Sequence, residues 1–223
     1  GANETIGSLA GSGTVDLQSF TLTVGGSSST SYTGVMSGTG GSLVKDGSGI
    51  LTLGGANSFT GGVTINSGTV RVGHNSGLGS GTLTMATGSG LSSDSGTART
   101  LINAYSMGGA VTLGDVTNNG ALTLTSGVTL GGNTTLTVLS PVTLNGVIGG
   151  GASSLTKAGG GELVLGAANT FTGGVTVSGG VVRLGNSASL GTGLVAMGPG
   201  TTLSSDSTSA RTLANGYSLS GAV

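Results

Sequence analysis

Residues 43–73, LVKDGSGILTLGGANSFTGGVTINSGTVRVG, return in nearly the same form as residues 155–185, LTKAGGGELVLGAANTFTGGVTVSGGVVRLG. The match extends without a gap from residues 34–111 to residues 146–223, at a constant spacing of 112 residues. A repeat this long within 223 residues indicates a modular array, the organisation of stalks, spacers and adhesive fibres. A residue present in both copies is therefore interpreted first as structural.

The composition argues for an ordered β-protein and against a flexible linker. Glycine accounts for 50 of 223 residues and charged residues for 6%, which alone would suggest a flexible linker. The apolar residues are mostly Val, Leu and Ile in short alternating runs, however, and these are strand formers, so we expect an ordered chain. There is no cysteine, which excludes disulfides and thiolate metal ligands. The net charge is −1 without a basic run, which argues against nucleic acid or an anionic membrane as partner.

Short alternating runs separated by glycine-rich turns predict many β-strands and no helix. The expected strands occupy residues 14–17, 20–24, 50–53, 62–65, 69–72, 81–85, 121–126, 134–139, 162–165, 174–177 and 181–184. A β-sandwich would need a closed core of about 100 residues with buried aromatics, but the chain has no Trp and repeats only Phe59/Phe171 and Tyr105/Tyr217. A narrow aliphatic core with Gly, Ser and Asn at the corners is typical of a solenoid. The sequence therefore predicts an all-β, right-handed parallel β-helix of about ten rungs.

We expect one continuous solenoid made of two modules, residues 1–111 and 112–223, and we interpret it as part of a longer array. Leu51, Leu53, Val63, Ile65 and Val70 are expected to be buried. Their counterparts Leu163, Leu165, Val175, Val177 and Val182 should occupy matching places.

Both repeated segments resemble the autotransporter-associated β-strand repeat. That family has a Leu-x-Lys-x-Gly-x-Gly-x-Leu-x-Leu-x-Gly-x-Asn-x-(Tyr/Phe)-x-Gly-Gly core, followed by a Gly-x-(Leu/Val) strand. The matching positions are Lys45, Gly47, Gly49, Leu51, Leu53, Asn57, Phe59, Gly61 and Gly62, and again Lys157, Gly159, Gly161, Leu163, Leu165, Asn169, Phe171, Gly173 and Gly174. One departure is the glycine before the Asn, which is Gly55 in the first copy and Ala167 in the second; it places a positive φ at this corner in question.

The resemblance implies a parallel β-helix on a secreted bacterial surface protein, and it implies no particular activity. We expect a non-enzymatic shaft or fibre segment on the cell exterior, acting as a stiff spacer or adhesive stalk. The expected partners are neighbouring repeats, end-to-end copies of the same chain, or host and environmental surfaces. Two alternatives stay open, namely a carbohydrate-active β-helix enzyme and an adhesin that binds glycan or ice through Thr-x-Thr strands.

No catalytic, cofactor-binding or metal-binding residue is predicted. Asn57 and Asn169 are interpreted as corner residues that hydrogen-bond the turn backbone. Lys45 and Lys157 lie in Ser-x-x-Lys, a spacing used by serine acyl-transferases on a helix, but on a strand these residues face opposite sides.

The remaining charged residues also recur. Asp94 with Arg99, and Asp206 with Arg211, predict an ion pair across a turn, with a ligand-binding acid as the alternative. Arg71 and Arg183 alternate with Val and are expected to point outward. The single His74 corresponds to Asn186, so no His-based site can occur twice, and the seven acids are scattered.

Overall fold

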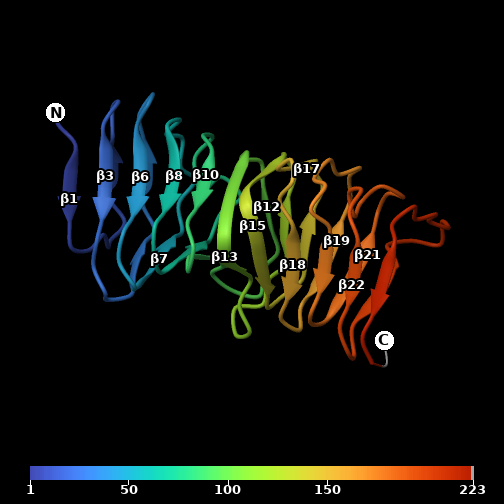
Figure 1. Cartoon of the computed structure of the whole chain (residues 1–223). Helices are drawn as coiled ribbons and strands as arrows, with labels where there is room; N and C mark the ends of the chain where they lie inside the picture. The colour runs from blue at the N-terminus through green and yellow to red at the C-terminus, as the bar shows by residue number, and fades with distance from the viewer. Residues whose placement is uncertain (222–223) are drawn as a thin grey trace.

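The computed structural model describes residues 1–221 and has 24 strands and no helix in that range. The strands lie side by side along one axis, from β1 at one end of a rod to β24 at the other (Figure 1). All strand pairs are parallel, and neighbours in space come from successive turns of the chain. The parallel β-solenoid of about ten turns predicted from the sequence is confirmed. No helix in this range could cross a membrane.

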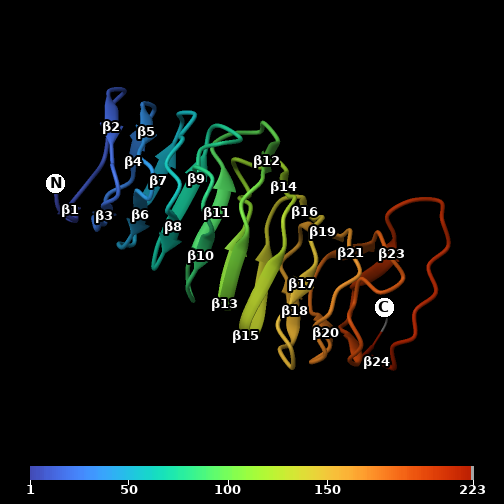
Figure 2. The same cartoon turned by 90° about the horizontal axis from the view of Figure 1, so that it is seen from above.

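Each turn contributes up to three strands, so the rod has three faces, and Figure 2 shows it from a second side. Face 1 contains β1 (Glu4–Ile6), β3 (Thr21–Val24), β6 (Ser42–Lys45), β8 (Gly62–Ile65), β10 (Leu83–Met85), the first parts of β13 (Tyr105–Leu113) and β15 (Val128–Val138), and β17 (Ile148–Gly149). Face 2 contains β4 (Thr30–Tyr32), β7 (Ile50–Leu53), β9 (Thr69–Val72), β11 (Gly90–Ser93), the second parts of β13 and β15, β18 (Leu155–Ala158), β20 (Val175–Val177), β22 (Val195–Met197) and β24 (Tyr217–Leu219). Face 3 contains β2 (Thr14–Asp16), β5 (Val35–Ser37), β12 (Arg99–Leu101), β14 (Leu122–Leu124), β16 (Val142–Leu144), β19 (Glu162–Leu165), β21 (Val181–Leu184) and β23 (Thr202–Ser205).

Strands β13 and β15 each run over two faces. Their pairing shifts register between Met107 and Gly109, where Gly109 has a φ of 68°. A left-handed residue turns the strand at a corner without ending it, and glycine adopts this conformation without a side-chain clash. No strand was predicted at 105–113, where the Gly108-Gly109 pair is typical of a turn.

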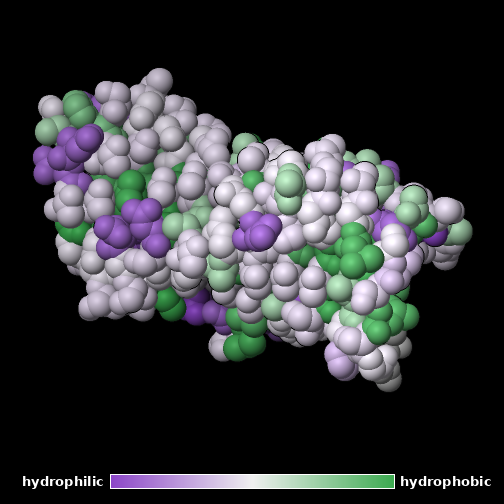
Figure 3. All heavy atoms as spheres, in the orientation of Figure 1, coloured by the Kyte–Doolittle hydropathy of each residue, from purple (hydrophilic) through white to green (hydrophobic). Residues whose placement is uncertain are grey.

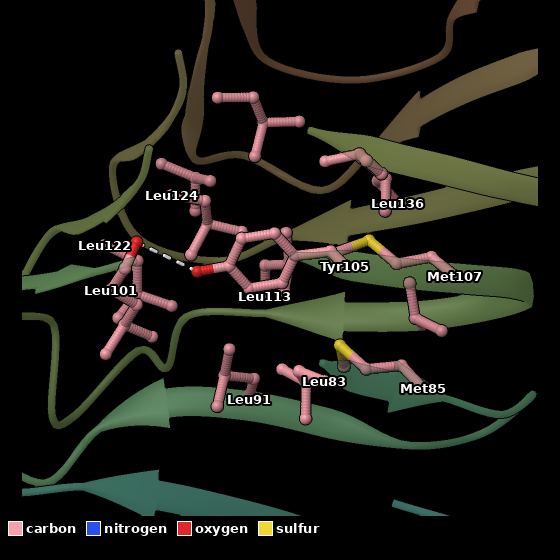
Figure 4. Packing of buried hydrophobic residues seen from close by; sticks show 14 of the residues in the cluster. Leu83, Met85, Leu91, Leu101, Tyr105, Met107, Leu113, Leu122, Leu124 and Leu136 are labelled. Carbon is pink, nitrogen blue, oxygen red and sulfur yellow. Dashed lines mark hydrogen bonds between the residues drawn. The ribbon is translucent and has the colours of Figure 1, made fainter. Parts of the chain in front are cut away.

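The core is a stack of aliphatic side chains inside the rod. Figure 4 shows leucine and methionine side chains from successive turns around Tyr105, whose hydroxyl donates to the Leu101 carbonyl at 3.0 Å. The ten positions predicted to be buried are confirmed, since none exposes more than 2% of its surface. At about 1.5–3 kcal/mol for each fully buried aliphatic side chain, this stack is the main stabilising contribution.

Two corner glycines of the repeat have different physical roles. Gly62 and its counterpart Gly174 have φ values of 98° and 89°, and an added Cβ at Gly62 would come within 2.4 Å of the Thr82 carbonyl oxygen. At Gly55 the questioned positive φ is not found. Its backbone instead approaches Gly34 so closely that a Cβ would lie 1.9 Å from that carbonyl oxygen. The second copy accommodates Ala167 at the same corner.

Candidate functional site

Apart from the lysines on β6 and β18, the repeat-defining residues gather in one segment per copy, from the end of β7 to the start of β8 and from the end of β19 to the start of β20. Phe59 and Phe171 are fully buried and anchor the loop in the core. Asn57 is also buried, although a polar amide is costly to bury unless its hydrogen bonds are made. The loop therefore depends on what the asparagine side chain contacts.

Asn57 connects three successive turns of the solenoid. Its Oδ1 accepts a hydrogen bond from the Met36 amide on the turn before at 2.8 Å, and its Nδ2 donates to the Gly77 carbonyl on the turn after at 2.6 Å. The side-chain amide of Asn57 thus takes the place of a backbone peptide group in the hydrogen-bond ladder between the turns. Asn169 repeats this arrangement, accepting from Ile148 N–H at 2.8 Å and donating to the Ser189 carbonyl at 2.5 Å. The hydrogen bonds reach beyond the local turn that the sequence suggested, to backbone about 20 residues away in each direction.

A second asparagine in each copy holds the corresponding loop of the following turn, and the sequence analysis missed it. Nδ2 of Asn103 donates to the carbonyls of Gly79 and Gly81, at 3.2 and 2.7 Å. Asn215 does the same to Gly191 and Gly193, at 3.1 and 2.7 Å. The Asn-x-Tyr spacing, which recurs at 103–105 and 215–217, was the available signal.

Lys45 and Lys157 lie inside the rod, a burial that was not predicted from the sequence. Both side chains are buried, and each follows a buried leucine two positions earlier on its strand. Nζ of Lys157 donates to the carbonyls of Ala158, Gly159 and Gly179, at 3.1, 2.8 and 2.9 Å. Nζ of Lys45 donates to the Gly47 carbonyl. The ammonium group of Lys157 therefore joins the corner of its own turn to the corner of the next one.

Burial shapes the protonation of these lysines. Loss of hydration disfavours the charged form and lowers the pKa of Lys157 to about 8. Burial lowers the pKa of Lys45 as well, and the Asp46 carboxylate offsets part of that change. Ser42 lies on the outer side of β6 while Lys45 faces inward, so the Ser-x-x-Lys spacing does not bring a hydroxyl and an amine together.

The predicted ion pairs across a turn are confirmed. Arg99 contacts Asp94 at 2.8 Å, and Arg211 contacts Asp206 at 2.9 Å. Arg71 and Arg183 point outward between buried valine and leucine neighbours, as expected from the alternation.

The partners of these two outward arginines differ between the copies. Arg71 reaches Asp115 at 2.7 Å, whereas Arg183 reaches Glu162 on the turn before at 2.6 Å. Partial burial alone would raise the pKa of Asp115, but the hydrogen bonds from Arg71 and from the Thr117 and Asn118 amides, with the charge of Arg71, hold it below its usual value. Ion pairs thus engage four of the seven acids, namely Asp94, Asp115, Glu162 and Asp206.

The other candidate residues stay apart. His74 contacts Ser76 in an exposed turn. Within residues 1–221 no three side chains among His, Asp and Glu come together in a way that could hold a metal ion. The geometry of the repeat positions is that of cross-ties between turns, formed by Asn and Lys side chains on backbone groups.

The comparisons with known proteins agree with this geometry. The family of the passenger-associated-transport repeat matches the chain twice, at residues 43–72 and 155–184. The adhesin BmaC autotransporter of Brucella suis biovar 1 (strain 1330) is 44% identical over 93 residues. That stretch is 37% of the present chain and 3% of the adhesin, so the chain matches a small part of this relative. No solved structure gives a significant match. Residues 43–72 and 155–184 are therefore similar to the passenger-associated-transport repeat, and the structure builds both segments into one parallel β-solenoid.

Proposed function

We propose that the chain is a stiff shaft segment of a secreted bacterial surface adhesin, which holds other parts of the molecule away from the cell. The observation that carries this proposal is the continuity of the ladders. Face 2 runs without interruption from β4 to β24, and asparagine side chains continue the ladder where face 1 and face 3 lack strands. Every turn is therefore tied to the next on all sides, as a spacer that resists bending requires.

The surface supports a structural role. Figure 3 shows a face of mostly intermediate hydropathy, with scattered strongly hydrophilic and hydrophobic residues. Charged residues make up 6% of the chain, and ion pairs within the chain engage most of them. The carbohydrate-active enzyme is the weaker alternative, because four of the seven acids already form ion pairs with arginines.

A surface-binding adhesin is the second candidate, and one feature favours it. Face 1 carries outward hydroxyl groups in a row along the axis, one on each of six strands, at Thr5, Thr23, Thr64, Thr84, Ser106 and Thr129. Val44 interrupts this row on β6. A single interrupted row fits a flat ice lattice poorly, since such a lattice needs a two-dimensional array, so a hydroxyl-rich polymer is the better ligand for this alternative.

The shaft and the adhesin predict different outcomes in one experiment. In the parent surface protein, residues 1–221 are replaced by an unrelated β-solenoid of the same number of turns, and attachment of cells to glycan-coated and plain surfaces is measured. A shaft predicts unchanged attachment with the substitute and a loss when the segment is deleted. Attachment that falls with the substitute as much as with the deletion would contradict the shaft and favour direct binding.

We further propose that the edge of β24 pairs with another parallel turn, either from a neighbouring repeat of the same chain or, end to end, from a second copy. On β24, Tyr217 and Leu219 expose 48% and 61% of their surface, whereas their counterparts Tyr105 and Met107 are buried beneath β15. The outer edge of β24 also has no strand partner within residues 1–221. Another parallel turn, supplied by a neighbouring repeat or by a second copy, would pair with this edge and cover both side chains.

A further inference from the structure

The two copies of the repeat are not stacked in phase around the axis. The asparagine loop of the first copy lies on face 3, where Asn57 follows β5. The corresponding loop of the second copy lies on face 1, where Asn169 follows β17. The same sequence motif thus occupies different faces of one rod.

Strand pairing gives the size of the rotation. From β6, the column on face 1 passes through β8, β10, β13 and β15 to β17, which is five turns further along the rod. The strand equivalent to β6 is β18, which is the next strand after β17 and pairs with the second part of β15 on face 2. A repeat of 112 residues therefore equals five turns plus one face.

Equivalent outward-facing residues of the two copies also lie on different faces. Thr64 belongs to the column Thr84, Ser106 and Thr129 on face 1. Its counterpart Thr176 belongs to the column Thr156, Thr135 and Ala110 on face 2. The first column passes through Ser106 on β13 and Thr129 on β15. The second passes through Ala110 on β13 and Thr135 on β15. The two columns are therefore separate columns on the same two turns.

We propose that this phase offset sets how the chain presents its repeated surfaces: equivalent surfaces of successive modules face different directions, one face of the rod apart. The inference goes beyond the shaft function, because a shaft with in-phase modules would be equally stiff. A rod can lay only one face against a flat partner, so a planar receptor layer can engage a repeated surface of one module at a time.

The stacking itself is tested first, in a chain that contains no cysteine of its own. The double variant Thr135→Cys/Thr156→Cys joins register partners on adjacent turns of face 2, where the Cα spacing of neighbouring strands suits a disulfide. The matched control Thr129→Cys/Thr156→Cys joins the positions that would be neighbours if the modules were in phase. We expect rapid oxidation of the first pair and none of the second. Oxidation of the second pair in preference to the first would overturn the proposal.

The display is tested by avidity on a flat surface. A biotin analogue of micromolar affinity is attached through a short linker to cysteines at Thr64 and Thr176, and dissociation from a planar streptavidin layer is measured. The control pair is Thr64 with Thr170, which lies on face 1 in the turn that carries Thr176, next to Gly149 in the Thr64 column. We expect the control pair to dissociate at least about tenfold more slowly than either single label, because both probes reach the layer together. The Thr64/Thr176 pair should dissociate within about twofold of a single label. Equal slowing of both pairs would overturn the proposal, and it would leave the shaft function intact.

Discussion

Replacing Asn57 with Ala should open the solenoid locally on both sides of its loop. The substitution removes the bond from the Met36 amide at 2.8 Å and the bond to the Gly77 carbonyl at 2.6 Å. Both bonds are buried, so a buried N–H and a buried carbonyl lose their partners at once. Each buried group left without a partner costs about 1–3 kcal/mol, which gives a local destabilisation of about 4 kcal/mol for the pair.

Amide hydrogen exchange measures this local opening directly at the Met36 amide. Turns of a solenoid open individually, so a global unfolding midpoint would understate a local loss. At about 1.4 kcal/mol for each factor of ten, exchange of the Met36 amide should accelerate by two to three orders of magnitude. Asn169→Ala should do the same at Ile148 and leave Met36 unchanged.

Two variants control for this reasoning. Asn119→Ala, at an exposed position, should leave exchange unchanged. Asn57→Asp keeps an acceptor for Met36 but turns a carboxylate oxygen toward the Gly77 carbonyl, so it should fall between the wild type and Asn57→Ala. If Met36 in Asn57→Ala exchanges within about threefold of the wild type, the cross-tie does not hold the turns together.

Four further predictions concern protonation, ion pairing, backbone strain and association. Because burial lowers the pKa of Lys157 to about 8, the unfolded chain binds this proton more tightly than the folded chain does. The free energy of unfolding should therefore rise by up to about 3 kcal/mol as the pH increases from about 8 to 10.5. The urea midpoint should rise less with pH in Lys157→Met, and an identical rise in that variant would refute the assignment. Asp115→Asn should destabilise the chain by about 1 kcal/mol at neutral pH and have no effect once the pH falls below the lowered pKa of Asp115. Glu162→Gln breaks a more exposed ion pair and should cost less than half of that free energy. Equal costs for the two variants would show that exposure does not set the strength of these pairs. Gly62→Ala combines a positive φ with a Cβ contact at 2.4 Å and should cost at least about 2 kcal/mol by denaturant titration, while Gly108→Ala, which meets open space at an ordinary φ, should be neutral or slightly stabilising. End-to-end association should appear as mass that grows with concentration in light scattering and should weaken in Leu219→Lys, whereas a monomer at every concentration would exclude it.

The sequence predicted the features that depend on local alternation. Runs such as ILTL at 50–53 and VVRL at 181–184 define one apolar side, and those residues are buried as expected. The Asp94–Arg99 pair was predictable for a similar reason, because both partners belong to one turn and their distance is set locally.

Other features depend on contacts between turns, which the sequence does not state. The bend within β13 was hidden because Gly108-Gly109 is compatible with a loop as well as with a corner inside a strand. The burial of Lys45 was not predicted, because isolated charges are rarely buried, although its alternation with Leu43 places it on the inner side of the strand. Predicting the offset between the modules would have required knowing how many faces each turn has. That number is hard to find in the sequence, because some turns cross face 1 or face 3 as a loop without a strand.

The direction of the backbone hydrogen bonds has a mechanical consequence. They run along the long axis of the rod, so a pull on the two chain ends loads the bonds of the terminal turn first and peels it from its neighbour. Each peeled turn of roughly 20 residues shortens the folded rod by about 4.8 Å and releases about 70 Å of extended chain. Under tension the solenoid would therefore lengthen in steps and dissipate energy turn by turn, and on relaxation a freed turn would find the edge of the remaining rod as a template for refolding.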